Sequence, residues 1–480
     1  MATIGSLASP GIGSGIDVNG IISQLMAVES RPIVNLQRAE GRLQAKLSGI
    51  GQLQGLVSSF KDALSALTKS DAYTQTLATS SDPTAVAATS SSSATAGAYA
   101  ISVQALAASQ TLVSASGLFT ASTDVVGTGT LTLRLGTFSA GQTVFTPKTG
   151  SADVTISIGA TENTLQGVRD KINAAKAGVV ASIVTDVNGA RLSLTSSATG
   201  AENGFRLTVV ESGAPGLGRL GFNPPGAVNQ MTLAQSAANS VATVNGISVT
   251  STDNTLTSAI PGVTLSLNKV TTAPVTVTVS NNLDAVKAML SKLASAYNDV
   301  NKFLSDQTRY DPQAKQGALF QGDSTIVRLQ NRVRSLVAES STASSTFTSL
   351  SAIGLEMQKD GSLKVNATKL DAAVKNLPEL TKALSQASGG APGSTGMATK
   401  LAEWADGLIS ATTGALPSQT KSLQKSLTAN GKQQASLSDR LAATEQRLRA
   451  QYGALDTTVS RYKALNNYVT QQFYTTKPTT

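Results

Sequence analysis

The sequence contains neither cysteine nor histidine, and each absence removes a class of chemistry. Without cysteine there are no disulfides and no thiolate metal sites. Without histidine there is no imidazole base, no imidazole metal ligand and no Ser-His or Cys-His dyad. A site made of carboxylates alone stays possible, but the 29 acidic residues form no tight cluster along the chain. We therefore expect no catalytic residue, no cofactor and no bound metal, and we expect that the chain is not an enzyme.

Aromatic residues are also scarce, at 4%, and charged residues make up only 14% of the 480 positions. No run of about 18 apolar residues exists, so the sequence predicts no membrane-spanning helix. The opening, MATIGSLASPGIGSGIDV, lacks a basic stretch followed by an apolar core, so it is not typical of a secretory signal peptide. We expect a protein that stays in the cytoplasm or leaves by a route without a cleaved signal. The length allows about three or four domains.

The net charge of +9 is unevenly placed. Residues 421–480 carry nine Lys/Arg and three Asp/Glu, a local charge of +6, whereas the signs balance over residues 81–280. A nucleic-acid interface would have aromatic or glycine-rich platforms among the charges. The pattern instead favours a solvated helix face, or attraction to an acidic partner surface.

What the sequence does contain is an apolar stripe at each end. The positions recur at three-and-four spacing, which places them on one side of a long helix that needs a partner helix. The N-terminal stripe comprises Leu36, Leu43, Leu47, Ile50, Val57, Phe60, Leu64 and Leu67. The C-terminal stripe comprises Leu423, Leu427, Leu437, Leu441, Leu448, Tyr452, Leu455, Val459, Tyr462, Leu465, Val469 and Phe473.

Asn430, Gln434 and Thr444 fall on the C-terminal seam, where polar residues weaken a coiled coil but fix its register. Two interpretations stay open. The stripes could form a helical hairpin within one chain, or a bundle between chains.

The N-terminal helix has clear start signals and a weakness. Residues 1–16 are predicted to be flexible, and Asp17 is a suitable N-cap for a short helix. Pro32 is suited to the first turn of a second helix that runs to about Lys69. That helix contains four glycines, each costing about 1 kcal/mol relative to alanine, so partner helices must supply its stability: Gly41, Gly49, Gly51 and Gly55.

The middle of the chain alternates apolar and polar residues with period two, which is typical of strands with one buried face. Asn188-Gly189 and Asn245-Gly246 each separate two such runs and predict hairpins. Leu165, Val168 and Ile172 predict one short helix within the β-rich region. Helices return from Asn282, with a small hairpin turning at Asp360-Gly361. GLGRLG at 216–221 matches a dinucleotide-binding pattern, but Phe-Asn-Pro-Pro follows it where a helix would have to begin, so we expect a loop.

The predicted fold class is multidomain α+β. Terminal helices form coiled-coil or helical-bundle legs, around a mostly helical domain with a small hairpin and two β-rich inserted domains. The expected segments are 1–35, a flexible stretch with a short helix; 36–78 with 282–415, helical; 79–126 with 232–281, β-rich; 127–231, an inserted β-rich domain; and 416–480, a coiled-coil helix.

Several motifs in order resemble the flagellar filament cap proteins, the hook-associated protein 2 family. GIGSGIDVNGIISQLMAVESRPIVNLQ (11–37) resembles the N-terminal signature of that family. IGLEMQKDGSLKVNATKLDAAVKNLP (353–378) and LRAQYGALDTTVSRYKALNNYVTQQF (448–473) resemble its C-terminal domain and closing helix. The departures are Leu377, which separates the family's Asn-Pro pair, and Tyr452, where the family often has phenylalanine. Residues 165–194 are similar to the insertion motif shared with flagellins.

The resemblance implies a secreted protein at the distal tip of the bacterial flagellar filament. Such proteins form a ring-like homo-oligomer, expected to be a pentamer, that retains exported flagellin and promotes its folding and insertion. Implied partners are a second copy, flagellin, the hook-filament junction proteins, an export chaperone and the type III export apparatus, with no nucleic acid. The expected oligomer and filament contacts are Ile16, Asp17, Leu25, Met26, Leu36, Leu43, Leu47, Ile50, Leu437, Leu441, Leu448, Tyr452, Leu455, Val459, Tyr462, Val469 and Phe473.

Two other functions stay open on the sequence alone. The Ser/Thr-rich strands allow a surface adhesin that binds host mucin or glycans through its β domains. A peptidoglycan hydrolase is also conceivable, although the missing histidine and the absent acid cluster argue against it.

Overall fold

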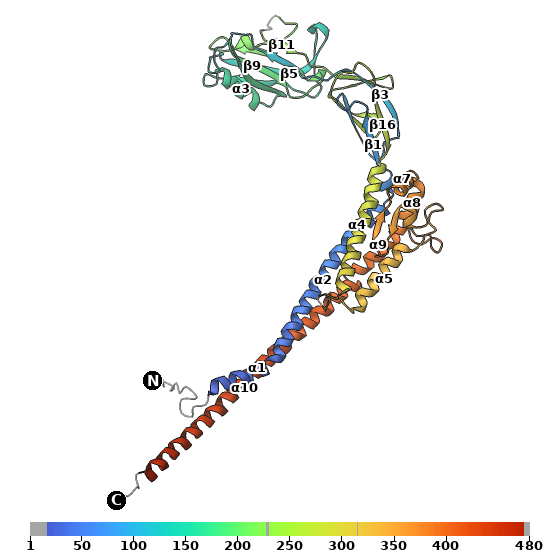
Figure 1. The fold of residues 1–480 in the computed structure, drawn as a ribbon. Helices are drawn as coiled ribbons and strands as arrows, with labels where there is room; N and C mark the ends of the chain where they lie inside the picture. Colours follow the sequence, from blue (N-terminus) through green and yellow to red (C-terminus); the bar gives the residue numbers. More distant parts are fainter. Residues whose placement is uncertain (1–16, 227–229, 314, 475–480) are drawn as a thin grey trace. The chain divides into compact units, whose positions relative to one another are not determined.

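The computed structural model describes residues 17–226, 230–313 and 315–474, and it contains two compact units. Unit 1 joins the two ends of the sequence, up to Ala72 and from Leu283, and unit 2 is the segment Tyr73–Asn282 between them. Figure 1 shows helices in the first unit and mainly strands in the second. The predicted fold class is confirmed. The five-part division remains a prediction, since the structural division is coarser.

Unit 1 is built from helices and two small hairpins. The helices are α1 (Val18–Glu29), α2 (Arg31–Thr68), α4 (Leu283–Thr308), α5 (Ser324–Ala338), α6 (Leu350–Ile353), α7 (Ala367–Ala373), α8 (Leu377–Ser385), α9 (Met397–Ile409) and α10 (Ala415–Tyr474). The hairpins pair β17 (Tyr310–Asp311) with β18 (Gln316–Gly317), and β19 (Leu355–Met357) with β20 (Leu363–Val365). A 3-10 turn, η1 (Ser70–Tyr73), follows α2.

Side-chain caps explain where several of these helices begin. Asp17 accepts a hydrogen bond from the Gly20 N–H and caps α1, as the sequence predicts. Asp323 caps α5 in the same way, and Pro32 occupies the first turn of α2. Gly354 ends α6 with φ of 107°, a left-handed conformation that favours glycine.

The second half of α2 lies in the core of unit 1. Its buried residues are Ile50, Leu53, Val57, Phe60, Ala63, Leu64 and Leu67, and the helix packs against α4, α9 and α10. The Phe60 and Tyr297 ring centroids are 6.1 Å apart. The Tyr297 hydroxyl donates to the Gly361 carbonyl at 2.8 Å, and burial raises the pKa of Tyr297 to about 12. These contacts supply the stability that the glycines of α2 remove.

Unit 2 contains β1 (Thr76–Ser80) to β16 (Val275–Asn281) in four sheets. The sheet orders are β1-β16-β3-β12-β13, β14-β15-β2, β11-β4-β9-β8, and β10-β5-β6 with β7 paired to β5. The remaining bounds are β2 (Val86–Ser90), β3 (Gly97–Ala105), β4 (Thr111–Val113), β5 (Gly129–Phe138), β6 (Phe145–Pro147), β7 (Val154–Ile158), β8 (Val179–Asp186), β9 (Gly189–Ser196), β10 (Gly204–Glu211), β11 (Thr232–Gln235), β12 (Ser240–Val244), β13 (Ile247–Ser251), β14 (Thr255–Ile260) and β15 (Val263–Leu267).

Two hydrophobic clusters form the cores of unit 2. The first gathers residues between Ala85 and Val103 with residues between Ala242 and Val279. The second lies between Leu112 and Met231 and includes one face of α3 (Leu165–Ala174), the predicted short helix. Three 3-10 turns also belong to this part: η2 (Ala140–Gln142), η3 (Ala201–Asn203) and η4 (Leu217–Leu220).

Of the two hairpin turns predicted for the β-rich middle of the chain, one is confirmed and the other is one residue off. Asn245 and Gly246 both have positive φ and connect β12 to β13, as a two-residue type I′ turn requires. In the other hairpin Asp186 pairs with Gly189, so the loop is Val187-Asn188 and Gly189 already belongs to β9. Gly189 has a φ of 118° at the start of β9. A Cβ at this position would lie 2.2 Å from the Phe119 carbonyl oxygen, so the close approach of the two backbones requires glycine.

Four side-chain amides each bond both the N–H and the C=O of a single residue. Such an amide replaces a neighbouring strand, satisfying two backbone groups that would otherwise lack a partner. The pairs are Gln110 with Phe205, Asn173 with Ala181, Asn254 with Ala107, and Asn298 with Leu363.

Candidate interaction surface of the terminal helices

The two terminal stripes meet within one chain. α2 and α10 pack side by side in unit 1 (Figure 1), with Leu423 and Asn430 buried and Leu36 and Leu437 half-buried between them. The interpretation as a helical hairpin is therefore correct for this part of the chain. An additional bundle between chains remains a prediction.

Polar residues on the seam bond across it. The Asn430 side-chain amide donates to the Leu36 carbonyl at 3.2 Å. Gln434 donates to the Glu40 carboxylate at 2.8 Å and to the Asn430 side-chain oxygen at 2.6 Å. These bonds can form at one offset of the two helices, so they set the register that polar seam residues were expected to fix.

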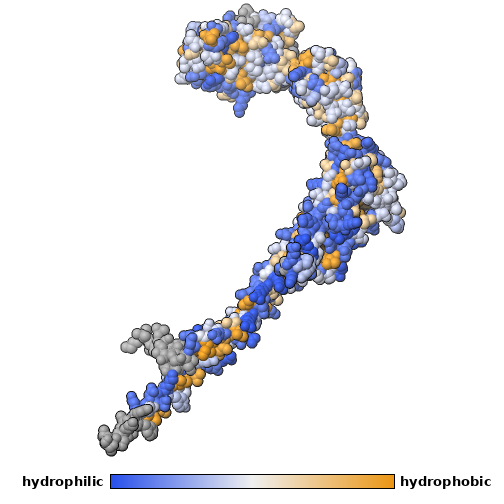
Figure 2. Space-filling view, viewed as in Figure 1, coloured by the Kyte–Doolittle hydropathy of each residue, from blue (hydrophilic) through white to orange (hydrophobic). Residues whose placement is uncertain are grey.

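The seam of α10 continues beyond its contacts with α2. α1 also packs on α10, and its inward residues Val18 and Ile22 are buried. Further along α10 the apolar residues become exposed, and Tyr462 reaches 68% exposure. Figure 2 shows hydrophobic residues on this end of unit 1. We call the following set the exposed stripe: Leu455, Tyr462, Leu465, Tyr468 and Val469.

α1 adds further exposed apolar side chains to the same end of unit 1. Leu25 is 40% and Val28 is 54% exposed, and Val34 near the start of α2 is 41% exposed. Exposed apolar residues that lie together on packed helices are typical of a surface that binds another protein.

The structure separates the predicted contact residues into groups. Ile50 is fully buried within unit 1, so its side chain belongs to the core in this structure, and a contact role for it remains a prediction. Exposed positions are Asp17, Leu25, Leu455, Tyr462 and Val469; half-buried positions are Met26, Leu36, Leu43, Leu47, Leu437, Leu441, Leu448, Tyr452 and Val459. Ile16 and the side chain of Phe473 lie outside the described part. The intermolecular role of these residues remains a prediction.

Sequence reasoning did not assign Tyr468 or Val28 to this surface. Tyr468 lies six residues after Tyr462 and one before Val469, so it falls outside the seven-residue repeat of the α10 seam, which is why the stripe pattern missed it. An aromatic residue without a core position on a long helix is itself a signal, because tyrosine is enriched where surfaces meet partners.

The GLGRLG segment is a loop, as predicted, and two of its glycine N–H groups bond a carboxylate of the same chain. The Glu211 carboxylate accepts hydrogen bonds from the N–H groups of Gly218 at 2.7 Å and Gly216 at 2.8 Å, and these bonds lower its pKa. η4 within this segment has only four residues. The loop therefore holds its own carboxylate rather than offering these amides to a phosphate.

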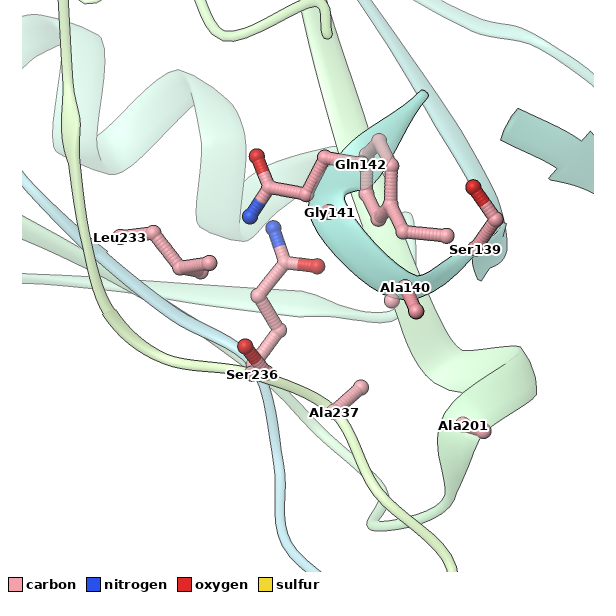
Figure 3. Close-up of a pocket in the computed structure, with 11 residues that line it drawn as sticks. Ser139, Ala140, Gly141, Gln142, Ala201, Leu233, Ser236 and Ala237 are labelled. Atoms are coloured by element: carbon pink, nitrogen blue, oxygen red, sulfur yellow. The ribbon is translucent and has the colours of Figure 1, made fainter. Parts of the chain in front are cut away.

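A hollow of about 500 Å³ lies beside η2 in unit 2. Figure 3 shows Ser139, Gln142 and Ser236 among the residues around it. The Gln110 amide in its wall is already bonded to the Phe205 backbone on both sides. All eleven lining residues are uncharged, so the hollow holds no acid or base for catalysis.

Two absences hold for residues 17–226, 230–313 and 315–474. Within these ranges, no group of three or more acidic side chains is arranged to hold a metal ion. Over the same ranges, no helix combines the length and the apolar character needed to cross a membrane.

Family comparisons match most of the sequence in the expected order. Residues 14–110 match the family described as flagellar hook-associated protein 2 N-terminus, and residues 237–464 match its C-terminus. Residues 137–198 match the flagellin hook IN motif, which contains the segment predicted to resemble a flagellin insertion.

Whole-length relatives agree. The chain is 32% identical to flagellar hook-associated protein 2 of Escherichia coli K12, with 98% of each chain covered. It is 31% identical to the B-type protein of Pseudomonas aeruginosa, with 93% of each covered. Its fold is similar to the crystal structure of the D1-D2-D3 domains of the flagellar cap protein FliD from Escherichia coli, at a TM-score of 0.58 and 31% identity, covering 78% of this chain and 99% of that one. The chain belongs to the flagellar hook-associated protein 2 family, a family of structural flagellar cap proteins that are not enzymes.

Proposed function

We propose that this protein is secreted and caps the distal tip of the flagellar filament as a ring-like homo-oligomer. In this role it retains exported flagellin and promotes its folding and insertion into the growing filament. The observation that carries the proposal is the exposed stripe, which leaves an apolar helix surface open at one end of unit 1. A second copy and flagellin are the partners we propose for it.

The remaining partners are proposed from the family resemblance alone. They are the hook-filament junction proteins, an export chaperone and the type III export apparatus, and the proposed ring is a pentamer. Electron microscopy of the purified protein tests the ring directly, because a five-fold ring would support this number and another symmetry would replace it. Binding to host mucin has no specific observation in its favour, so we do not propose it.

The decisive experiment truncates the chain at a structurally informed position. Deleting residues 455–480 removes the exposed stripe but keeps Leu423, Asn430 and the other α10 residues that pack on α2. We expect cells with this truncation to shed flagellin monomers into the medium and to lack full-length filaments, as measured by immunoblot and electron microscopy.

A substitution variant separates loss of surface from loss of chain length. Leu455→Ser with Tyr462→Ser and Val469→Ser changes three exposed stripe residues, and Thr457→Ser with Asn467→Ser is the control at exposed polar positions of α10. The stripe variant should shed flagellin and the control should not. Filaments of normal length in both the truncated and the stripe-variant strains would reject the proposed function.

A further inference from the structure

A second surface of unit 1 is cationic and lies apart from the exposed stripe. Asn35, Arg38, Ala39, Arg42, Leu43 and Lys46 line a hollow of about 480 Å³ on one face of α2. Their spacing of three and four residues places them side by side along the helix. Arg42 and Lys46 also line a neighbouring hollow of about 610 Å³, whose other wall is formed by residues 316–319 and Gln321. We call the two together the cationic groove.

Gly49 allows the second wall to approach α2. A Cβ at this position would lie 2.9 Å from the Phe320 ring and 3.1 Å from the Leu319 side chain. Phe320 is fully buried against the helix, and the Lys46 ammonium lies 5.9 Å from its ring centroid. The glycine therefore shapes the groove by letting the 316–321 segment close onto the helix.

The charges of the cationic groove are not neutralised within the described chain. None of the residues lining the two hollows is acidic. In residues 17–226, 230–313 and 315–474, Arg38, Arg42 and Lys46 have no carboxylate within ion-pair distance. The nearby Glu40 carboxylate is bonded to Gln44 and Gln434 instead. Like charges four residues apart repel one another and weaken a helix, so a partner that brings carboxylates would relieve this repulsion.

The chemistry of the groove indicates what kind of partner fits. Ala39 and the half-buried Leu43 lie between the cations and offer a small apolar surface, flanked by the amides of Gln316 and Gln321. An amphipathic helix with carboxylates beside small apolar residues complements this arrangement. A single-stranded nucleic acid is typically bound with exposed rings for stacking, and Phe320, the ring beside Lys46, is buried.

In the part that the structure describes, a second copy of this chain does not offer a helix with the required row of free carboxylates. Several acidic side chains on the helices of unit 1 already pair with a lysine of the same chain, as Lys61–Asp406, Lys287–Asp371, Lys302–Asp306 and Lys382–Glu379 show. Other acids lie far apart, on different helices, and do not form the regular acidic face that the groove would need: Glu29, Asp62, Asp299 and Asp439. We propose that the cationic groove docks an acidic amphipathic helix of another protein.

Fluorescence anisotropy with a defined probe tests the proposal. The probe is a labelled helical peptide of about 20 residues, with Glu at every fourth position and Ala and Leu between. A peptide with Gln in place of Glu is the control ligand. The full-length protein should bind the acidic peptide and not the Gln peptide, and raising the salt from about 50 to about 500 mM should weaken binding.

Matched protein variants locate the binding. Arg38→Glu with Arg42→Glu and Lys46→Glu should weaken binding at least about tenfold, because it reverses the complementary charges. Lys421→Glu with Lys425→Glu and Lys432→Glu makes the same charge change at exposed positions of α10, beside a hollow that is lined by this helix alone and has no second wall, and should change binding less than about twofold. Circular dichroism checks that both variants are folded. The milder Arg38→Gln with Arg42→Gln replaces the first variant if it does not fold, with the same direction expected.

Three results would overturn the proposal. Equal losses in the two charge-reversal variants would show that net charge, not the groove, attracts the peptide. Equal binding of the Gln peptide would exclude carboxylate recognition. An oligonucleotide of about 20 nucleotides that displaces the peptide, and whose binding depends on Arg38 and Arg42, would assign the groove to nucleic acid.

Discussion

At the scale of single residues, the amides that replace strand neighbours make the sharpest stability prediction. Gln110 is 1% exposed, and its amide bonds both the N–H and the C=O of Phe205 at 2.9 and 2.8 Å. Gln110→Ala leaves both groups buried without a partner, so we expect unit 2 to lose about 2–4 kcal/mol of unfolding free energy. Urea denaturation followed by circular dichroism measures the loss.

Gln142 provides the control for this substitution. It lines the same hollow but is only half-buried, and its φ of 60° suits glycine. Gln142→Gly should therefore change the unfolding free energy by less than about 0.5 kcal/mol. A Gln110→Ala protein as stable as this control would show that the amide pairing is not needed.

Glu379 predicts an acid-dependent loss of stability. Its carboxylate accepts hydrogen bonds from the Lys382 ammonium at 2.7 Å and from the Ser344 hydroxyl at 2.7 Å, which lowers the pKa of this carboxyl from its ordinary value of 4.5 to about 2. A lowered folded-state pKa stabilises the protein above about pH 4.5, and this stabilisation is lost as the pH falls toward 2.

Thermal melting of Glu379→Gln tests this dependence. The variant should melt below the parent protein at pH 7, and the difference should vanish as the pH approaches about 2. Glu29→Gln, at an exposed position of α1, is the control and should melt with the parent at every pH. A difference between Glu379→Gln and the parent that does not depend on pH would contradict the assignment.

At the scale of elements, the polar residues between α2 and α10 are expected to lower the stability of the helix pair while fixing the register of the two helices. Asn430→Leu with Gln434→Leu replaces the bonds to Leu36 and Glu40 by apolar contact. We expect a higher melting temperature and a less defined offset of the two helices, because the polar residues fix register at a cost in stability. Spin labels at Gln37 and Gln433, both exposed, should give a broader distance distribution than in the parent protein.

Thr428→Leu, on the exposed side of α10, is the matching control. It adds a comparable side chain away from the seam, so neither the melting temperature nor the distance distribution should change appreciably. A seam variant with an unchanged distance distribution would show that the apolar stripe alone fixes the offset.

Sequence patterns predicted those elements whose signals are local. The Asn245-Gly246 turn follows from two residues that tolerate positive φ, and α3 follows from the spacing of Leu165, Val168 and Ile172. The Val187-Asn188 loop was displaced by one residue because Gly189 is used to approach the Phe119 backbone, a contact that the hairpin sequence does not contain. Likewise, the sequence predicts that Gly49 only lowers the stability of α2. The structure shows that this glycine also makes room for the Phe320 ring, which lies far along the chain.

The candidate surface could be predicted only in part, because its exposure also depends on contacts between residues that are far apart in the sequence. The three-and-four spacing identified the stripe of α10, but it could not tell the part covered by α1 and α2 from the part left exposed at Leu455 and Tyr462. Ile50 has the same spacing as its exposed counterparts, and it is a core residue because this part of α2 is buried within unit 1. The net charge of a long segment does not reveal the row of Arg38, Arg42 and Lys46, because only their four-residue spacing on a helix brings the three cations together.

At the scale of the whole molecule, the two units should fold independently. Each has its own hydrophobic residues, and unit 2 is a single continuous segment of the chain. We expect residues 73–282, produced alone, to melt cooperatively at the temperature of the corresponding transition in the full chain. A segment that is unfolded by circular dichroism would contradict this independence.

The single tryptophan of the sequence reports on the unfolding of unit 1 in the full chain. Trp404 lies half-buried on α9 in unit 1. Its fluorescence during urea unfolding should therefore follow unit 1, while circular dichroism follows both units. A Gln110→Ala substitution in unit 2 should leave the fluorescence midpoint unchanged.

The sequence of unit 2 interrupts the sequence of unit 1, and this order has a consequence for the kinetics of folding. The entering and leaving strands are neighbours, since Thr76 of β1 pairs with Asn281 of β16. All strand pairs of unit 2 can therefore form as soon as residue 281 has been synthesised. The core half of α2 must wait for α4, α9 and α10, which follow only after the whole of unit 2. During synthesis, unit 2 can fold first while α2 remains unpartnered, and closure of unit 1 over this long separation should be the slow step.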